Sequence, residues 1–386
     1  MKVFYYRLYP TKAQKKNLNQ TLELCRWTYN QTLALRKNAW ETEQKNIDYY
    51  DSKKMIPIWK KDKPELKTVH SQVLQEVIKR VDLAFQAFFR RVKAGEKPGY
   101  PRFKGYGRYD SITYTQSGFS LENNILTLSK IGDVKIKLHR PIEGNIKRLN
   151  IRRSITRKWY VSILTDLDSH NPLEYSDNSV GIDVGLTTFA ALSDGTFIEN
   201  PRFYVKEQKN LAKIQRKHSK QAKGTPERRK ALKVLQRVHE RIYNKREDFT
   251  QKLSKSLVDN YGIICFEDLN INKMVKDPIY AKGIMDAAWN KLVTYTSYKA
   301  ENAGRKVILV NPYNTSQICS RCGTIVEKDI SVRTHNCTLC GLSIDRDLNA
   351  SFNILRLGVQ SLRETDRCPS LYRLSDNYLK SSEFPF

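Results

Sequence analysis

The sequence predicts a multidomain α/β protein, and three observations support that fold class. Residues 111–168 contain short runs in which apolar and polar positions alternate, separated by Asn- and Gly-containing turns, as in a small β-barrel. Apolar runs at 179–192, 261–267 and 306–311 are typical of buried strands in a second sheet. Two Cys-x-x-Cys pairs then predict a metal site near the end of the chain.

A strand is predicted at the start of the chain. Residues 3–9 are rich in aromatic side chains, and Pro10 ends the run. We expect this strand, within residues 1–10, to pair with the barrel strands of 105–170. The helices between them, at 11–104, are then an insertion into the barrel.

Two helical segments are predicted within this insertion. Thr11 and Gln14 have the spacing of a capping box, which satisfies free backbone groups at a helix start. Apolar residues between 73 and 92 recur every three or four positions and form one broad face. Between these two segments, the stretch from about 45 to 66 is polar and rich in Lys, Asp and Pro.

The second half of the chain follows a polar linker at 168–178 and contains a strongly basic region. Between Lys206 and Arg246 there are fifteen basic and three acidic residues, and Gly224-Thr225-Pro226 divides the region into two helices. A solvated helical hairpin is one interpretation of such a charge run. The interpretation we favour is a surface that faces nucleic acid.

The composition supports that choice. Lys and Arg number 68 against 40 Asp and Glu, so the net charge is +28 and the pI is about 9.7. Such an excess repels itself unless a polyanion neutralises it, which makes nucleic acid the leading partner. The sequence has no apolar run long enough to span a membrane and no signal-peptide pattern, and Cys25, Cys265 and Cys368 have no evident partners. We therefore expect a soluble cytoplasmic protein without a membrane partner.

The paired cysteines predict a zinc site. Each Cys-x-x-Cys turns tightly enough for both thiolates to reach one ion, and Gly323 and Gly341 after the pairs allow the positive φ of such turns. Two disulfides or scattered core cysteines are the alternative. The predicted zinc ligands are Cys319, Cys322, Cys337 and Cys340.

Three acids lie where an apolar element meets a turn: Asp183, Glu267 and Asp347. Burying a carboxylate is costly without a nearby cation, and hard oxygen ligands suit Mg²⁺ or Mn²⁺. Two such ions can support hydrolysis of a phosphodiester. The order of strands and acids is that of a ribonuclease-H-like nuclease. Asp268 and Asp345 compete with Glu267 and Asp347 for these roles.

Seven motifs resemble the TnpB family, transposon-encoded relatives of the type V CRISPR effectors. They are YRLYPT (6–11), RWTYN (26–30), GYPRFK (99–104), GIDVG (181–185), FEDLN (266–270), TSQICSRCG (315–323) and DRDLNA (345–350). The resemblance implies that Asp183, Glu267 and Asp347 are the catalytic, magnesium-binding acids of an RNA-guided DNA endonuclease.

The resemblance also implies a domain organisation and partners. It assigns 1–10 and 105–170 to a wedge-type barrel, 11–104 to a helical recognition lobe, 178–315 and 342–360 to a RuvC-like nuclease, and 316–341 to a zinc ribbon that binds target nucleic acid. The partners implied are a guide RNA from the transposon end and double-stranded DNA beside a short adjacent motif. We expect a monomer acting at the prokaryotic nucleoid, and a tail at 361–386 that needs no fold.

Gln72 and Gln75 are candidate contacts to the adjacent DNA motif. They lie three residues apart on one predicted helix edge, and a glutamine side chain can pair bidentately with adenine. Ordinary solvated helix positions are the alternative interpretation.

Four other functions are compatible with parts of the sequence. The segment from Gly181 resembles a phosphate loop of actin-like ATPases and sugar kinases, but no second phosphate hairpin or adenosine site accompanies it beyond Asp194-Gly195. A repressor-like RNA-guided protein that binds without cleaving is opposed by the intact acids. The acids would permit strand-transfer transposition, but the resemblance favours guided cleavage. A compact type V CRISPR effector differs from TnpB in its genomic locus, which the polypeptide does not record.

Overall fold

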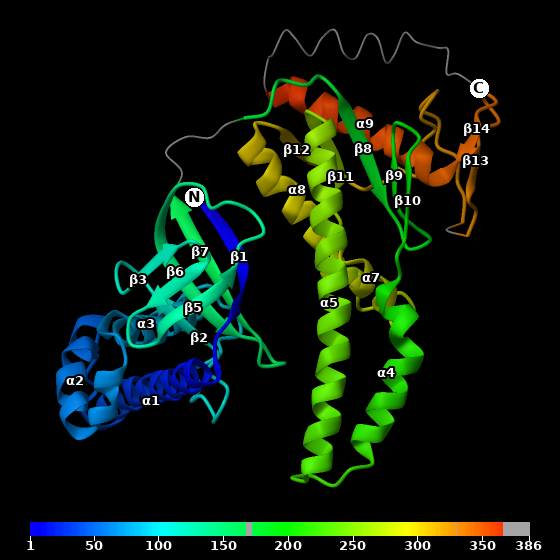
Figure 1. Cartoon of the computed structure of the whole chain (residues 1–386). Helices are drawn as coiled ribbons and strands as arrows, with labels where there is room; N and C mark the ends of the chain where they lie inside the picture. Colours follow the sequence, from blue (N-terminus) through cyan, green and yellow to red (C-terminus); the bar gives the residue numbers. More distant parts are fainter. Residues whose placement is uncertain (167–171, 330, 366–386) are drawn as a thin grey trace. The chain divides into compact units, whose positions relative to one another are not determined.

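The computed structural model describes residues 1–166, 172–329 and 331–365, which belong to two compact units, Met1–Ser169 and His170–Phe386 (Figure 1). Each unit has its own sheet and its own hydrophobic core. In the part of the chain that the structure describes, no helix is both long and apolar enough to cross a membrane.

The first unit is built on a seven-stranded antiparallel sheet with the order β2-β6-β7-β1-β5-β4-β3. The first strand of the chain lies at its centre, between β5 and β7, so residues 3–9 do pair with strands of 111–168. The strands are β1 (Lys2–Tyr9), β2 (Ser111–Tyr114), β3 (Phe119–Glu122), β4 (Ile125–Leu128), β5 (Gly132–Lys137), β6 (Asn145–Arg153) and β7 (Trp159–Asp166).

The sheet curls toward a barrel whose seam lies between β2 and β3. These edge strands follow one another in the chain, and the link from Tyr114 to Phe119 can span at most about 18 Å. Seven strands laid flat would be about 29 Å across, so the two edges must approach each other. A hydrogen bond from the hydroxyl of Tyr114 to the carbonyl of Ser129, 3.0 Å long, crosses toward the other edge.

The helices inserted between β1 and β2 are α1 (Lys12–Glu43), α2 (Tyr49–Asp62) and α3 (Ser71–Lys93), with a short 3₁₀ helix at Pro64–Thr68. The capping box of Thr11 and Gln14 is present at the start of α1. The sequence pattern predicts no helix in the polar stretch at 45–66, most of which α2 occupies. This helix buries Ile56 and Trp59 on one side and exposes its charged residues. Its apolar face is therefore too narrow to give a recognisable helical repeat of apolar residues in the sequence.

The second unit contains a mixed five-stranded sheet with the order β10-β9-β8-β11-β12. Strands β8, β9 and β10 form an antiparallel meander, whereas β11 runs parallel to both β8 and β12. The bounds are β8 (Ser179–Val184), β9 (Thr188–Leu192), β10 (Phe197–Glu199), β11 (Ile263–Glu267), β12 (Lys306–Val310) and the separate hairpin β13 (Thr334–Asn336) and β14 (Ser343–Asp345). The helices are α4 (Phe203–Ser219), α5 (Pro226–Asn260), α6 (Ile271–Met274), α7 (Ala281–Ala287), α8 (Trp289–Ala303) and α9 (Arg346–Thr365).

Two glycines let α9 lie directly on this sheet. A Cβ at Gly181 of β8 would lie 2.1 Å from the carbonyl oxygen of Ser351 in α9. A Cβ at Gly358 of α9 would lie 2.2 Å from the sulfur of Cys265 in β11. Such separations are far below van der Waals contact, so only glycine permits this close packing of the helix on the strands.

The predicted start of the C-terminal tail at 361 was too early, because α9 continues to Thr365. Leu362 is buried against Ile263 and Val310, so the apolar face of α9 extends one turn further than expected. The remainder of the predicted tail, 366–386, lies outside the described residues.

The basic region forms two helices, α4 and α5, which pack together through Leu211, Val238 and Ile242 (Figure 1). An ion pair fixes this hairpin to α7. Asp286 is 7% exposed and accepts hydrogen bonds from Nε of Arg246, at 2.8 Å, and from the backbone N–H of Tyr204, at 2.9 Å.

Replacing Asp286 with alanine should lower the free energy of unfolding by about 3–5 kcal/mol, because the Arg246 charge and an N–H group would lose their buried partner. Urea unfolding followed by circular dichroism would measure the change. Asp259→Ala is the matched control, because Asp259 forms an exposed pair with Lys255, and such pairs contribute at most about 1 kcal/mol. Equal effects of the two substitutions would contradict this role.

Candidate active site and metal centre

Two of the predicted acids lie side by side at the ends of neighbouring strands. Asp183 is in β8 and Glu267 is the last residue of β11. The two strands are parallel, and Ile182 pairs with Phe266, so Asp183 and Glu267 are level with each other. Residues at the same level of adjacent strands point to the same face of a sheet, so both carboxylates are directed the same way.

The third acid, Asp347, reaches this region from the first turn of α9. Its side chain is buried, and Oδ2 would lie 3.9 Å from a Cβ at Gly185, immediately after β8. The close contact of α9 with β8 at Gly181 places the carboxylate there. The structure therefore brings Asp183, Glu267 and Asp347 together from three elements.

Burial and neighbouring carboxylates both act on the pKa values of these acids. Burial raises the pKa of Asp183 well above its usual value, and the carboxylates of Glu267 and Asp347 raise it further. Burial also raises the pKa of Glu267, although the hydroxyl of Thr315, which donates a hydrogen bond to Glu267 Oε1, acts against this. Carboxylates that destabilise one another in this way are stabilised by a bound divalent ion.

Two arginines neutralise Asp347. Arg346 donates a hydrogen bond of 2.8 Å to Oδ1, and Arg333 lies 3.5 Å from Oδ2. Arg333 also donates to the hydroxyl of Thr187 in the turn between β8 and β9, at 2.7 Å. The side chain of Arg333 is 48% exposed, so it can move aside when the carboxylate takes another partner.

The competing acids have other positions. Asp345 caps α9, because its Oδ1 accepts hydrogen bonds from the backbone N–H groups of Asp347, at 2.8 Å, and Leu348, at 3.1 Å. Asp268 is exposed and lies one residue past Glu267. Because successive side chains of a strand point to opposite faces of the sheet, Asp268 is directed away from the face that carries Glu267. Asp268 does not share the arrangement of the three acids, whereas Asp345 lies close enough to raise the pKa of Asp183 further, after burial, Glu267 and Asp347.

The four cysteines form a group that could hold a metal ion. Their sulfur atoms all lie within 4.8 Å of one another. The Cys319 and Cys340 sulfurs are 3.6 Å apart, and those of Cys322 and Cys337 are 3.5 Å apart. Four thiolates around zinc, each about 2.3 Å from the ion in a tetrahedron, would be about 3.8 Å apart. The donor set and its spacing therefore fit a zinc ion.

The two cysteine turns have the same local structure, which explains how they converge. In the first, the N–H of Gly323 donates to the carbonyl of Cys319, and in the second the N–H of Gly341 donates to the carbonyl of Cys337, both at 2.9 Å. The glycines have φ of +80° and +71°. The predicted need for positive φ at both positions is confirmed.

Two asparagines of α9 connect the cysteine segment to the acids. Asn349 donates to the carbonyl of Ile318 at 2.8 Å and accepts from the N–H of Ser320 at 2.9 Å. Asn353, one turn on, donates to the carbonyls of Thr315 and Ile318 at 2.9 and 2.7 Å. Both side chains are fully buried, so they hold the first cysteine turn against the helix that carries Asp347.

Sequence reasoning missed the residues that support the site: Thr315, Arg333, Asn349 and Asn353. Asn349 and Asn353 carried a detectable signal, since two amides four residues apart in an otherwise apolar helix imply a buried polar contact. Arg333 carried no such signal, because its position depends on how the cysteine segment folds.

The two predicted DNA-motif contacts lie at the start of α3. Gln72 uses its carbonyl oxygen within the protein, where it accepts from the N–H groups of Gln116, at 3.3 Å, and Ser117, at 3.1 Å, next to the barrel seam. Gln75 is partly buried. A bidentate contact of Gln72 with a base would have to replace these internal hydrogen bonds.

Comparisons with known proteins match three parts of the chain to family profiles. Residues 162–277 match OrfB_IS605, described as "Probable transposase", and residues 289–354 match the Cas12f1-like TNB domain. Residues 1–45 match the helix-turn-helix domain of OrfB_IS605 proteins, although here they form the strand β1 and the single helix α1.

Full-length relatives are also similar. A protein of Streptomyces pristinaespiralis, named as an RNA-guided DNA endonuclease, is 35% identical over 93% of this chain and 89% of its own length. InsQ of Escherichia coli K12, similarly named, is 31% identical over 93% of this chain and 92% of its own. The CRISPR-associated endodeoxyribonuclease Cas12f1 of Sulfoacidibacillus thermotolerans is 30% identical over about half of each chain, 51% and 50%.

Proposed function

The chain belongs to the transposon-associated TnpB (OrfB_IS605) family, and we propose from this that it is an RNA-guided DNA endonuclease, with RNA and DNA as its partners. The net charge of +28 supports polyanionic partners. The single observation that supports cleavage best is the convergence of Asp183, Glu267 and Asp347, with the pKa of Asp183 raised by the other two.

We propose that the second unit is a RuvC-like nuclease domain whose three acids bind Mg²⁺ or Mn²⁺. The bound ions would supply an activated water and a counter-charge for the leaving oxygen of a phosphodiester. The chain's own contribution is to fix the carboxylates through β8, β11 and the close packing of α9. Thr315 orients Glu267, and Arg333 supplies a positive charge at the edge of the site.

We further propose roles for the other parts. The four cysteines would hold zinc in a ribbon at 316–341 that binds target nucleic acid, and the barrel with its helical insertion would act as wedge domain and recognition lobe. The guide RNA would come from the transposon end, and the target would be double-stranded DNA beside a short adjacent motif. Gln72 and Gln75 would read that motif once Gln72 releases its internal hydrogen bonds. The protein would act as a monomer, because base pairing performs the sequence reading.

The test is cleavage of a plasmid library by the purified protein with its transposon-end RNA in Mg²⁺. Cutting that depends on the guide sequence and occurs beside one motif is the expected result. Guide-dependent binding without cutting would instead indicate an RNA-guided binding protein, and failure to bind the RNA would overturn the proposal. Activity only with the RNA of a CRISPR array would identify a compact type V effector.

Arg333 provides a second, independent prediction. Arg333→Ala should slow cleavage by about ten-fold or more, because a positioned cationic donor near the reacting phosphate would be lost. Arg333→Lys, which keeps the charge but not the planar fork, should retain more activity. Single-turnover cleavage rates with zinc content measured in parallel would check this. An unchanged rate in Arg333→Ala would remove Arg333 from the site.

A further inference from the structure

The outer face of the first unit's sheet carries a transverse row of cations around a tyrosine. Lys137 of β5 pairs with Arg7 of β1, Arg7 pairs with Tyr160 of β7, and Tyr160 pairs with Arg152 of β6. The row therefore crosses four adjacent strands with three positive charges and no carboxylate. Arg152 has an acidic partner outside the row, Asp110, at 3.0 Å.

This row is unfavourable for the protein alone. Like charges directly opposite each other on neighbouring strands destabilise a sheet, and Arg7 and Lys137 are such a pair. In addition, Nη1 of Arg7 is buried and has no hydrogen-bond partner within the described residues. An anion over this face would relieve the repulsion between Arg7 and Lys137.

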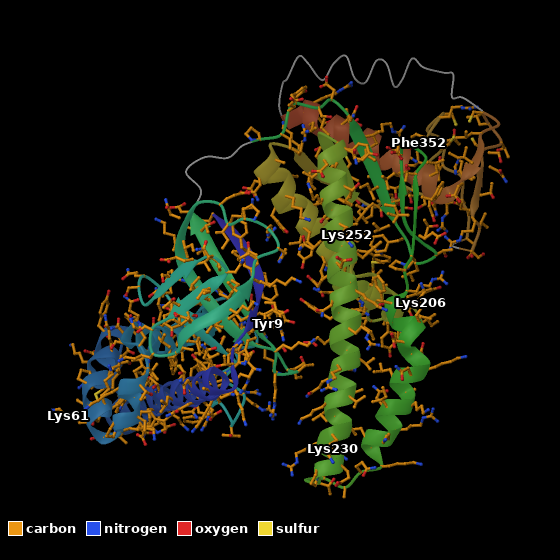
Figure 2. All side chains as sticks on the ribbon, viewed as in Figure 1. Tyr9, Lys61, Lys206, Lys230, Lys252 and Phe352 are labelled. Atoms are coloured by element: carbon orange, nitrogen blue, oxygen red, sulfur yellow. The ribbon has the colours of Figure 1, made fainter. Side chains whose placement is uncertain are left out.

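Aromatic rings extend along the same face. The rings of Tyr5 and Tyr160 stack with centroids 5.1 Å apart and an interplanar angle of 11°. The Arg7 guanidinium lies 4.7 Å from the Tyr160 ring and 5.5 Å from that of Tyr9. Tyr9 is labelled at the end of β1 in Figure 2. Tyr5 is 49% exposed and Tyr9 is 51% exposed, so the series of flat groups has open surface at both ends.

We infer that this face, defined by Tyr5, Arg7, Tyr9, Lys137 and Tyr160, binds unpaired nucleotides of the guide RNA. Bases would stack on the exposed tyrosine rings, and phosphates would contact Arg7 and Lys137. The inference rests on the proposed function, which supplies RNA as a partner. It adds that the RNA is held here through unstacked bases.

The chemistry of the face favours unpaired RNA over a duplex. Aromatic side chains on an exposed sheet can take a base only when that base has left its own stack, whereas a duplex offers mainly phosphates. Single-stranded DNA and duplex RNA are therefore outcomes to be distinguished by experiment.

The experiment compares the full-length protein with a Tyr5→Ala/Tyr160→Ala variant. Fluorescence anisotropy would measure binding of a labelled oligouridylate, an oligothymidylate and a fully paired RNA hairpin. The variant should bind oligouridylate about ten-fold or more weakly, because each stacked base contributes substantially to affinity, while its binding of the hairpin is unchanged. Tyr5→Phe/Tyr160→Phe, which keeps the rings, should bind like wild type.

Two controls keep this result interpretable. Tyr50→Ala removes an exposed tyrosine from α2 of the same unit and should leave oligouridylate binding unchanged. Thermal unfolding of each variant separates lost binding from lost folding. An equal loss of affinity for the hairpin and for oligouridylate would overturn the inference, and so would no loss of affinity for either. An equal loss of affinity for oligothymidylate would show that the face binds single strands of either kind.

Failure of this inference can be distinguished from failure of the proposed function. If wild-type protein cleaves DNA under RNA guidance but the alanine variant binds oligouridylate normally, only this inference fails. If wild-type protein shows no guided cleavage, the proposed function fails whatever the tyrosines do.

Discussion

Asp183→Asn should abolish RNA-guided DNA cleavage, by on the order of a thousand-fold or more, while leaving guided DNA binding intact. The amide preserves the size of the side chain but cannot supply the negative charge that a divalent ion requires. Single-turnover cleavage would measure the loss, and a gel-shift assay with guide and target would measure binding. Asp268→Asn is the matched control, because it removes an exposed carboxylate one residue past Glu267.

A cleavage rate near wild type in Asp183→Asn would refute the assignment of this acid. Loss of cleavage together with loss of binding would indicate damage to the fold instead. The stability of the variant decides between these cases.

The same substitution should change how stability depends on pH. Folding raises the pKa of Asp183, so between its usual value of about 3.9 and the raised value the native state holds the proton more tightly than the unfolded state does. Without Mg²⁺, wild-type stability should therefore fall as the pH rises through this interval. Asp183→Asn should flatten the fall in melting temperature, and added Mg²⁺ should do the same for wild type.

Cys337→Ser should abolish the zinc binding proposed for the four cysteines and unfold the segment that they enclose. Structural zinc contributes about 10–16 kcal/mol in small zinc domains, far more than the apolar contacts of this segment can replace. Metal analysis should show loss of zinc. Cys25→Ala is the control, because Cys25 is buried in the first unit and its loss should leave the zinc content unchanged.

Loss of the zinc should also reduce cleavage. The first cysteine turn is held by hydrogen bonds to Asn349 and Asn353 of α9. The cysteine segment also brings Arg333 into contact with Asp347. Full cleavage by a zinc-free Cys337→Ser protein would show that the cysteine segment and the acids work independently.

The parts of the fold that could be predicted are those in which a single helix or strand shows a clear pattern of apolar and polar residues. The alternation of apolar and polar residues at 3–9 and at 111–168 predicted strands that do pair in one sheet. The capping box predicted the start of α1. α2 was missed because its buried face consists of little more than Ile56 and Trp59. The short helices α6 and α7 likewise have too few turns for periodicity to distinguish them from loops.

The site was predictable to the extent that it is built from strand ends. Asp183 and Glu267 interrupt apolar strands, and carboxylates at such positions require an explanation wherever they occur. Arg333 and Thr315 lie in irregular segments, and their approach to Asp347 and Glu267 depends on contacts between residues far apart in sequence. The stacked face of Tyr5 and Tyr160 similarly depends on strand register, which alternation alone does not determine.

The central place of β1 has a consequence for how the chain folds. The ribosome makes this strand before its neighbours β5 and β7, which are complete only after Asp166 has been added, so the helices at 12–93 can form long before the barrel closes. Pairing over such sequence separations is slow. A nascent or N-terminally clipped chain would expose the edges of β5 and β7, which are templates for aggregation. Affinity tags and fusions should accordingly be kept away from Lys2.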